Sequence, residues 1–187
     1  FLGKEDKIRF KEKFCFFSKK NEVNGIIWFH GASVGEILTI VPIVKKFEKD
    51  NKIKKILITS STTSSSYILS KYKFKKTIHQ FYPFDLNIFT KMFIKYWKPQ
   101  LAIFVDSEIW PNMYNNLFKK NIPLILLNAR ITKKSFSRWK YFPNFSKNIF
   151  EKINIALPQN LETKKYLKLL GTKNIKVAGN LKFYGTS

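Results

Sequence analysis

Short apolar runs alternate with amphipathic stretches along almost the whole chain, and this alternation is the feature that most restricts its fold. The apolar runs cover residues 26–29, 55–59, 78–82, 101–105, 124–127, 153–157 and 175–178. Helical spacing of apolar residues marks the stretches 37–47, 67–72, 87–97, 109–120, 135–150 and 161–170. Continuous apolar strands separated by helices are typical of a parallel sheet covered on both faces. We therefore predict an α/β, Rossmann-like domain with helices on both faces of its sheet.

The chain divides into a basic arm and one domain. Its 187 residues are 44% hydrophobic, which is enough for a real core and too much for a disordered tail. Residues 1–24 are basic with scattered aromatics, and we interpret them as an N-terminal arm, solvated or packed on the domain as a helix; a helix lying on a membrane surface is the alternative. Residues 25–187 form the predicted domain. No run is long enough to cross a membrane, and because the chain begins with Phe1 rather than Met we expect further sequence upstream.

The charge is strongly positive. There are 35 Lys and Arg residues against 12 Asp and Glu, a net charge of +23, which suits nucleic acid, an anionic membrane surface or an acidic substrate. Only Arg9, Arg130 and Arg138 are arginines, and Ile, Asn and Phe are abundant, as in proteins from AT-rich genomes. The charge alone therefore does not indicate a nucleic-acid partner. The single Cys15 excludes an internal disulfide and fits a reducing compartment.

A loop of small residues, 30–36, follows the first predicted strand and opens the first predicted helix. Its small residues, among them Gly31 and Gly35, let the backbone come close to a ligand, and its amides lie at a helix N-terminus that favours negative charge. Glu36 falls in the first helical turn, where the positive helix end should keep its carboxylate ionised, as a general base requires. The alternative is that Glu36 only complements the helix dipole, which is a common use of Glu.

Further polar residues follow other predicted strands. Asp106 and Glu108 come after the strand 101–105, and Arg130 comes after the strand 124–127. Ligands of parallel sheets bind beyond the carboxyl ends of the strands, so we expect these residues to gather there with Glu36. Together the acids would supply a base and an orienting partner, although Asp106 or Glu108 capping the helix near Ile109 is an equal alternative. Arg130 is a candidate phosphate ligand.

Other patterns indicate no metal and no cofactor. Two histidines and one cysteine without ligand spacing predict no metal site, and neither a Walker-type loop nor Gly-x-Gly-x-x-Gly is present. His30 ends a predicted strand, and we interpret it as a hydrogen-bonded structural residue. The hydroxyl-rich run 60–66 has the residues to bind phosphate or sugar, but we interpret it as a flexible loop.

Several motifs, in order and with matching spacing, resemble one family. They are Trp28–Glu36, Tyr82–Asp85, Ser107–Asn112, Ile122–Leu124 with Asn128–Arg130, and Gly179–Phe183. Together they cover almost the whole chain and are similar to the Kdo transferases of lipopolysaccharide synthesis, which use the sugar 3-deoxy-D-manno-octulosonic acid (Kdo).

The resemblance implies an inverting glycosyltransferase of GT-B architecture, with two Rossmann-like domains facing a cleft. This chain would be the N-terminal, acceptor-binding half, inactive alone because the C-terminal donor domain is missing from it. Kdo would pass from CMP-Kdo to a hydroxyl of the lipid A precursor, at the cytoplasmic face of the bacterial inner membrane and beside its anionic surface. The residues so implicated are Glu36 as general base, Asp106 and Lys182 as transition-state stabilisers, and Ser33, Gly35, Glu108 and Arg130 as acceptor ligands.

Two positions depart from the family pattern. Asp106 stands where the family usually has Glu, and Tyr184 stands where it has Asp. The main alternative function is a basic nucleic-acid-binding α/β domain, which would bind DNA or RNA in a strongly salt-dependent way without needing Glu36. No nucleic-acid motif is present and the clustered acids would repel phosphate, so we expect no nucleic-acid partner. A third alternative is a degenerate domain kept for interaction only.

Overall fold

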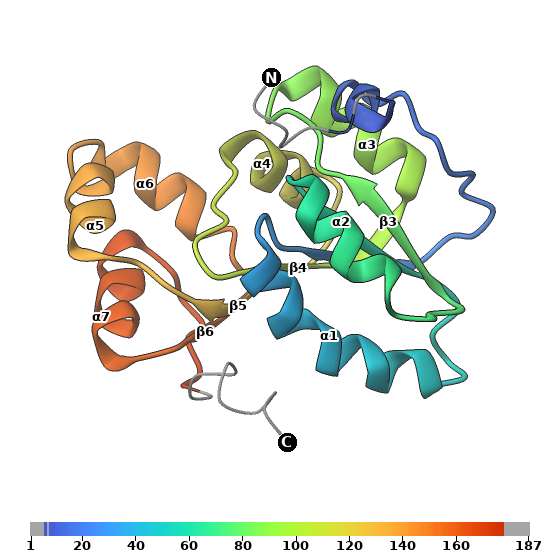
Figure 1. Ribbon diagram of the computed structural model, residues 1–187. Helices are drawn as coiled ribbons and strands as arrows, with labels where there is room; N and C mark the ends of the chain where they lie inside the picture. Colours follow the sequence, from blue (N-terminus) through green and yellow to red (C-terminus); the bar gives the residue numbers. More distant parts are fainter. Residues whose placement is uncertain (1–5, 7, 178–187) are drawn as a thin grey trace.

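The computed structural model describes residue 6 and residues 8–177 of the chain. Six strands form one sheet in the order β3-β2-β1-β4-β5-β6, and every neighbouring pair is parallel (Figure 1). The strands are β1 (Ile26–His30), β2 (Ile56–Ser60), β3 (Thr77–Phe81), β4 (Pro99–Val105), β5 (Leu124–Ala129) and β6 (Ile155–Pro158). The predicted parallel α/β fold is therefore confirmed. None of the helices in the described part of the chain is long and apolar enough to cross a bilayer.

Helices cover both faces of the sheet. One face packs against α1 (Val34–Lys49) and α2 (Thr63–Ser70); the other packs against α3 (Asn87–Trp97), α4 (Pro111–Lys119), α6 (Pro143–Phe150) and α7 (Leu161–Leu170). Successive strand residues point to opposite faces, so Trp28 lies in one hydrophobic cluster and Phe29 in the other, both fully buried. The strands are continuous apolar runs because each of them has two faces to bury.

Two predicted helical boundaries were wrong. The stretch 135–150 is two helices, α5 (Lys133–Lys140) and α6, because Pro143 begins α6 and disfavours a helical conformation at Phe142 before it. The run 60–66 is not a loop: Ser60 ends β2, and the Thr62 hydroxyl caps α2 by accepting a hydrogen bond from the Ser65 N–H.

The last predicted strand, 175–178, is also shorter than expected. Ile175 forms a single parallel bridge to Ala156 of β6, and Ala178 lies outside the described residues.

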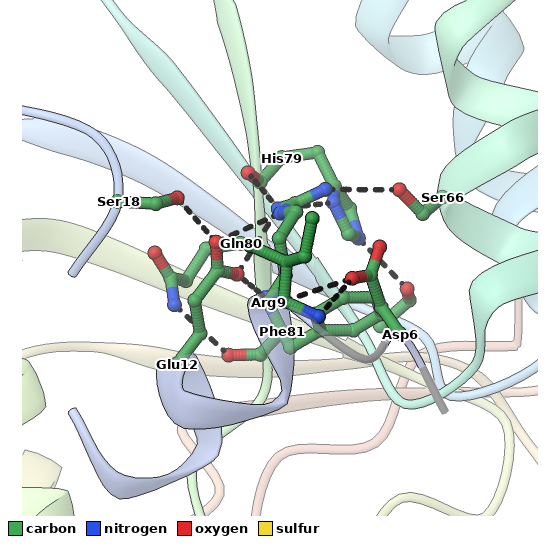
Figure 2. Close-up of polar contacts among 10 residues, drawn as sticks. Asp6, Arg9, Glu12, Ser18, Ser66, His79, Gln80 and Phe81 are labelled. Atoms are coloured by element: carbon green, nitrogen blue, oxygen red, sulfur yellow. Dashed lines mark hydrogen bonds and ion pairs between the residues drawn. The ribbon is translucent and has the colours of Figure 1, made fainter. Parts of the chain in front are cut away.

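The N-terminal segment packs on the outer side of the edge strand β3. It contains a short 3-10 helix, η1 (Arg9–Phe14), and Figure 2 shows its charged contacts with the sheet. The Arg9 guanidinium donates to both oxygens of Glu12, at 2.8 and 3.0 Å, and to the backbone carbonyl of His79 at 3.0 Å. Glu12 is 1% exposed and accepts a hydrogen bond from the Phe81 N–H at 2.9 Å. Both members of this partly buried ion pair thus form hydrogen bonds with the backbone of β3 and join the segment to it.

The same segment continues over α3, beside which it lies in Figure 1. The Cys15 thiol is buried and donates to the carbonyl of Phe89, and the Phe17 ring stacks on Tyr96 with centroids 3.9 Å apart. The Asn21 side chain donates to the carbonyl of Tyr96 at 2.8 Å.

Candidate active site

The loop between β1 and α1 holds Glu36 in a fixed position. Ser33 is the N-cap of α1, and its hydroxyl accepts from the Glu36 N–H at 3.4 Å and donates to Glu36 Oε1 at 2.8 Å. Glu36 Oε2 accepts from the Ala32 N–H at 2.8 Å. A Cβ on Gly31 would lie 2.9 Å from the Glu36 Cβ, so only glycine lets the helix begin this close to the strand. The carboxylate is therefore both a capping group and a preoriented side chain.

The hydroxyl-rich run supports this loop from the neighbouring strand. The Ala32 carbonyl accepts hydrogen bonds from the Ser61 N–H at 3.2 Å and from the buried Ser65 hydroxyl at 3.4 Å. Ala32, whose N–H donates to Glu36, is thus held through its carbonyl by residues that follow β2. These serines position the loop, a role that neither of the two sequence interpretations foresaw.

Glu108 is held by two donors, the partly buried Trp110 and the buried His30. The Trp110 indole N–H donates to Glu108 Oε2 at 2.8 Å, and His30 Nε2 lies 3.0 Å from the same oxygen. His30 is fully buried, its Nδ1 lies 2.9 Å from the Thr59 hydroxyl, and its ring stacks on Tyr82 with centroids 3.9 Å apart. The ends of β1, β2 and β4 together fix this carboxylate.

Asp106 follows β4 in a left-handed backbone conformation, with φ +62°. Its carboxylate accepts from the Ser107 hydroxyl at 2.9 Å, and its backbone carbonyl accepts from the Arg130 N–H at 3.1 Å. Short polar residues such as Asp tolerate this conformation better than longer side chains do. The backbone therefore gives a local reason for Asp at this position.

Two neighbouring acids act electrostatically on Glu36. The pKa of Glu36 is raised from its ordinary 4.5, first by burial and then by the charge of Glu108. Hydrogen bonds from Ser33 and Ala32 lower this pKa, and the charge of Asp106 raises it further. The positive helix end by itself favours the ionised form, but burial and the neighbouring acids outweigh the hydrogen bonds at this helix end and raise the pKa. Glu36 consequently accepts a proton more readily than an ordinary surface glutamate.

The capping alternative for Asp106 and Glu108 was wrong. Asp85, in the connection between β3 and α3, accepts hydrogen bonds at the start of α4 from the Asn112 N–H at 3.0 Å and the Met113 N–H at 2.8 Å. Because Asp85 is 26 residues upstream of α4, no local cap signal could have revealed it. Asp106 and Glu108 both lie close enough to Glu36 for their charges to raise its pKa.

The structure describes some of the other predicted site residues but not all of them. Ser33 and Gly35 are exposed beside Glu36, and a Cβ on Gly35 would meet nothing within 4 Å. The Arg130 side chain is exposed directly after β5, next to Asp106. Lys182, like Tyr184, lies outside the described residues. Within residues 8–177 no group of three or more His, Cys, Asp or Glu side chains is arranged to hold a metal ion.

Comparison with known proteins identifies the family of this chain. Residues 8–184 match the family described as 3-deoxy-D-manno-octulosonic-acid transferase. The chain belongs to the Kdo transferase family. It is 38% identical over 182 residues to the 3-deoxy-D-manno-octulosonic acid transferase of Rickettsia bellii, covering 97% of this chain and 43% of that protein. The Haemophilus influenzae transferase is 30% identical over 159 residues, covering 84% of this chain and 37% of that protein.

The chain thus spans less than half the length of these Kdo transferases. Among solved structures, it is similar to the UDP-GlcNAc 2-epimerase of Neisseria meningitidis, with a TM-score of 0.61 at 13% identity, over 87% of this chain and 47% of the epimerase. The Rickettsia bellii UDP-N-acetylglucosamine 2-epimerase gives a TM-score of 0.59 at 12% identity, over 88% and 47%. These likenesses show the fold, which corresponds to one half of a GT-B-like architecture.

Proposed function

We propose that this chain is the acceptor-binding half of an inverting glycosyltransferase that moves Kdo from CMP-Kdo to a hydroxyl of the lipid A precursor. The observation that carries the proposal is the placement of Glu36: a preoriented carboxylate whose pKa is raised by burial and by Glu108, at the carboxyl edge of the sheet. A general base needs this combination of fixed geometry and raised proton affinity.

The proposed reaction uses Glu36 in that position. Glu36 takes the proton of the acceptor hydroxyl as the oxygen attacks the anomeric carbon of Kdo, and the bond from that carbon to CMP breaks, with CMP leaving on the opposite side. Asp106 and Lys182 stabilise charge in the transition state. We expect the donor to be bound mainly by the part of the Kdo transferases that this chain does not match.

Acceptor recognition falls to the rim of the same edge. Ser33, Gly35 and Glu108 border Glu36, and the exposed Arg130 guanidinium suits a phosphate of the precursor because it forms two parallel hydrogen bonds. Gly35 supports this role, since open space surrounds it and packing gives no reason for a glycine there.

An anionic membrane surface is the second proposed partner, at the cytoplasmic face of the bacterial inner membrane. The turn between α5 and α6 supports it by exposing Tyr141 and Phe142, at 80% and 69%, followed by Phe145 at 51%. Basic side chains flank this turn: Lys133, Lys134, Arg138, Lys140 and Lys147. Aromatic rings beside lysines are typical of surfaces that lie against anionic lipid.

Binding of the purified chain tests the proposal. The bisphosphorylated lipid A precursor is compared with a generic anionic lipid and with duplex DNA, at low and at moderate salt. We expect preference for the precursor to persist at moderate salt. Equal binding to all three that fades with salt would show only the net charge of +23 and would contradict acceptor recognition.

A matched pair of arginine variants sharpens the test. Arg130→Gln should weaken precursor binding about tenfold, the effect of one charge-assisted contact. Arg138→Gln removes the same charge from exposed α5 and should leave the preference for the precursor in place. Equal losses in both variants would argue against a specific phosphate site at Arg130.

A further inference from the structure

We propose that His30 is a positioning residue that holds Glu108 for the acceptor, through a hydrogen-bond chain running from Trp28 to Trp110. The inference rests on the proposed function for its consequence, but the chain itself is a property of the fold. Sequence alone had suggested only a hydrogen-bonded structural role for this histidine.

The chain of contacts crosses three strand ends without a break. The Trp28 indole N–H donates to the Thr59 hydroxyl at 2.9 Å, and that hydroxyl lies 2.9 Å from His30 Nδ1. On the other side of the ring, Nε2 lies 3.0 Å from Glu108 Oε2. Trp28, Thr59 and His30 are all fully buried, whereas 14% of the Glu108 side chain is exposed. The network is therefore anchored in the core and ends at the site.

Hydrogen-bonding capacity places a proton on Nε2 of His30. An ionised Glu108 carboxylate only accepts, so the ring must carry a proton on Nε2 and donate it. In the neutral ring Nδ1 is then an acceptor, which is satisfied by the Thr59 hydroxyl while the Trp28 N–H donates to the oxygen of that hydroxyl. Each buried group then has a partner, and the ring cannot rotate without losing two of them.

This arrangement determines what Glu108 can do. Both donors, His30 and Trp110, reach the same oxygen, Oε2, which leaves Oε1 to accept a hydrogen bond from an acceptor hydroxyl. It also keeps the charge of Glu108 beside Glu36. His30 would thus act on the acceptor through Glu108 without touching it.

Two substitutions distinguish the contact made by Nδ1 from the contact made by Nε2. Histidine Nδ1 is mimicked by the Asn amide and Nε2 by the longer Gln amide. His30→Asn should therefore keep a polar contact to Thr59 and lose Glu108, whereas His30→Gln should keep a donor to Glu108. In precursor binding by the full chain we expect H30N to weaken Kd about tenfold and H30Q to recover most of that loss.

A double-mutant cycle tests whether His30 works through Glu108. Glu108→Gln alone should weaken Kd by about as much as H30N, and the H30N/E108Q double variant should be no weaker than either single variant. If the two losses instead add, or if H30N binds as tightly as wild type, the positioning role is overturned. Thermal unfolding is measured alongside, because a purely structural histidine would lower Tm in H30N and H30Q alike without the selective recovery of binding.

Ring 15N NMR gives a second readout that needs no ligand. The chain has two histidines, so His79→Gln identifies the His30 signals. We expect the wild-type His30 ring to carry its proton on Nε2 and that proton resonance to shift in E108Q. An unchanged resonance would overturn the contact. If the wild-type chain shows no preference for the precursor, the proposed function fails. The NMR result by itself still supports or overturns the hydrogen bond between His30 and Glu108.

If H30N does not fold, Thr59→Val replaces it in both measurements. Valine keeps the volume but removes the hydroxyl that donates to Nδ1 and accepts from the Trp28 N–H, so the ring loses the contact that orients it. A shifted Nε2 proton resonance together with weaker precursor binding would support the proposal; an unchanged resonance with unchanged binding would contradict it.

Discussion

The carboxylate of Asp85, in the connection between β3 and α3, accepts a hydrogen bond from the backbone N–H of Met113 in the first turn of α4, 2.8 Å away. Asp85→Ala should lower the free energy of unfolding by about 1–2 kcal/mol, because it removes the cap of α4. Asp85→Asn keeps an acceptor oxygen and should cost less. Urea unfolding of the two variants measures this difference, and equal losses would mean that the charge of Asp85, rather than its acceptor geometry, stabilises α4.

Glu36 makes the stability of the protein depend on pH. Its pKa is higher in the folded protein than the 4.5 of an unfolded chain. In the pH window between these two pKa values, the folded state therefore binds more protons than the unfolded state. The free energy of unfolding therefore falls as pH rises through the window. Glu36→Gln keeps partners for Ala32 and Ser33, so it should be more stable than wild type at about pH 7 and similar to it below 4.5. Unfolding curves at the two pH values measure the difference, and an E36Q variant less stable at neutral pH would contradict the burial argument.

The two glycines of the Glu36 loop should respond oppositely to alanine. Gly31→Ala places a Cβ 2.9 Å from the Glu36 Cβ and should destabilise the fold by about 1–3 kcal/mol. Gly35→Ala enters open space in a helix and should stabilise it by up to about 1 kcal/mol while weakening precursor binding. Thermal unfolding and the precursor-binding assay separate these effects. A G35A variant that binds the precursor normally would show that the ligand does not approach there.

His79 should contribute to unfolding in acid. Burial, together with the nearby Arg9 charge, lowers its pKa from 6.5 to about 3. Between pH 6.5 and about 3, His79 is protonated in the unfolded chain but not in the folded protein. The free energy of unfolding therefore falls as pH falls from 6.5 towards 3. His79→Gln should flatten the dependence of unfolding free energy on pH in this range. An unchanged slope would show that other groups dominate the acid transition.

The single thiol reports on the N-terminal segment. Cys15 is 5% exposed, and burial raises its pKa to about 12, so the native protein should react slowly with thiol reagents. Glu12→Ala leaves Arg9 without its carboxylate and the Phe81 N–H without its acceptor, and should speed labelling by loosening the segment. Stopped-flow labelling in native buffer measures the rate. Glu22→Ala is a surface control on the same segment and should leave labelling slow.

Much of the fold could be predicted because its determinants are local. Strands with two buried faces are apolar throughout, as in β1, and the helices between them carry their own periodicity. The gathering of Glu36, Asp106 and Glu108 also followed from sequence, since parallel strands place their carboxyl ends at one edge. The break before Pro143 had a local signal in the proline itself, and the cap at Thr62 had one in its hydroxyl, two features that the apolar pattern alone does not register.

Other features depend on contacts between distant segments. The hold of Asp85 on α4 and that of Ser65 on the Ala32 carbonyl join residues that no periodic pattern relates. The raised pKa of Glu36 depends on burial and on a second carboxylate brought close by folding, whereas the sequence shows only the nearby helix end.

The N-terminal segment also determines how this sheet meets other molecules. β3 is an edge strand, and its outward-facing Phe81 N–H and His79 carbonyl are already bonded to Glu12 and Arg9. A bare edge offers such groups to any passing strand and invites edge-to-edge aggregation. Here the side chains of Arg9 and Glu12 already bond these two edge groups. The segment therefore hinders pairing of β3 with a strand of a neighbouring copy.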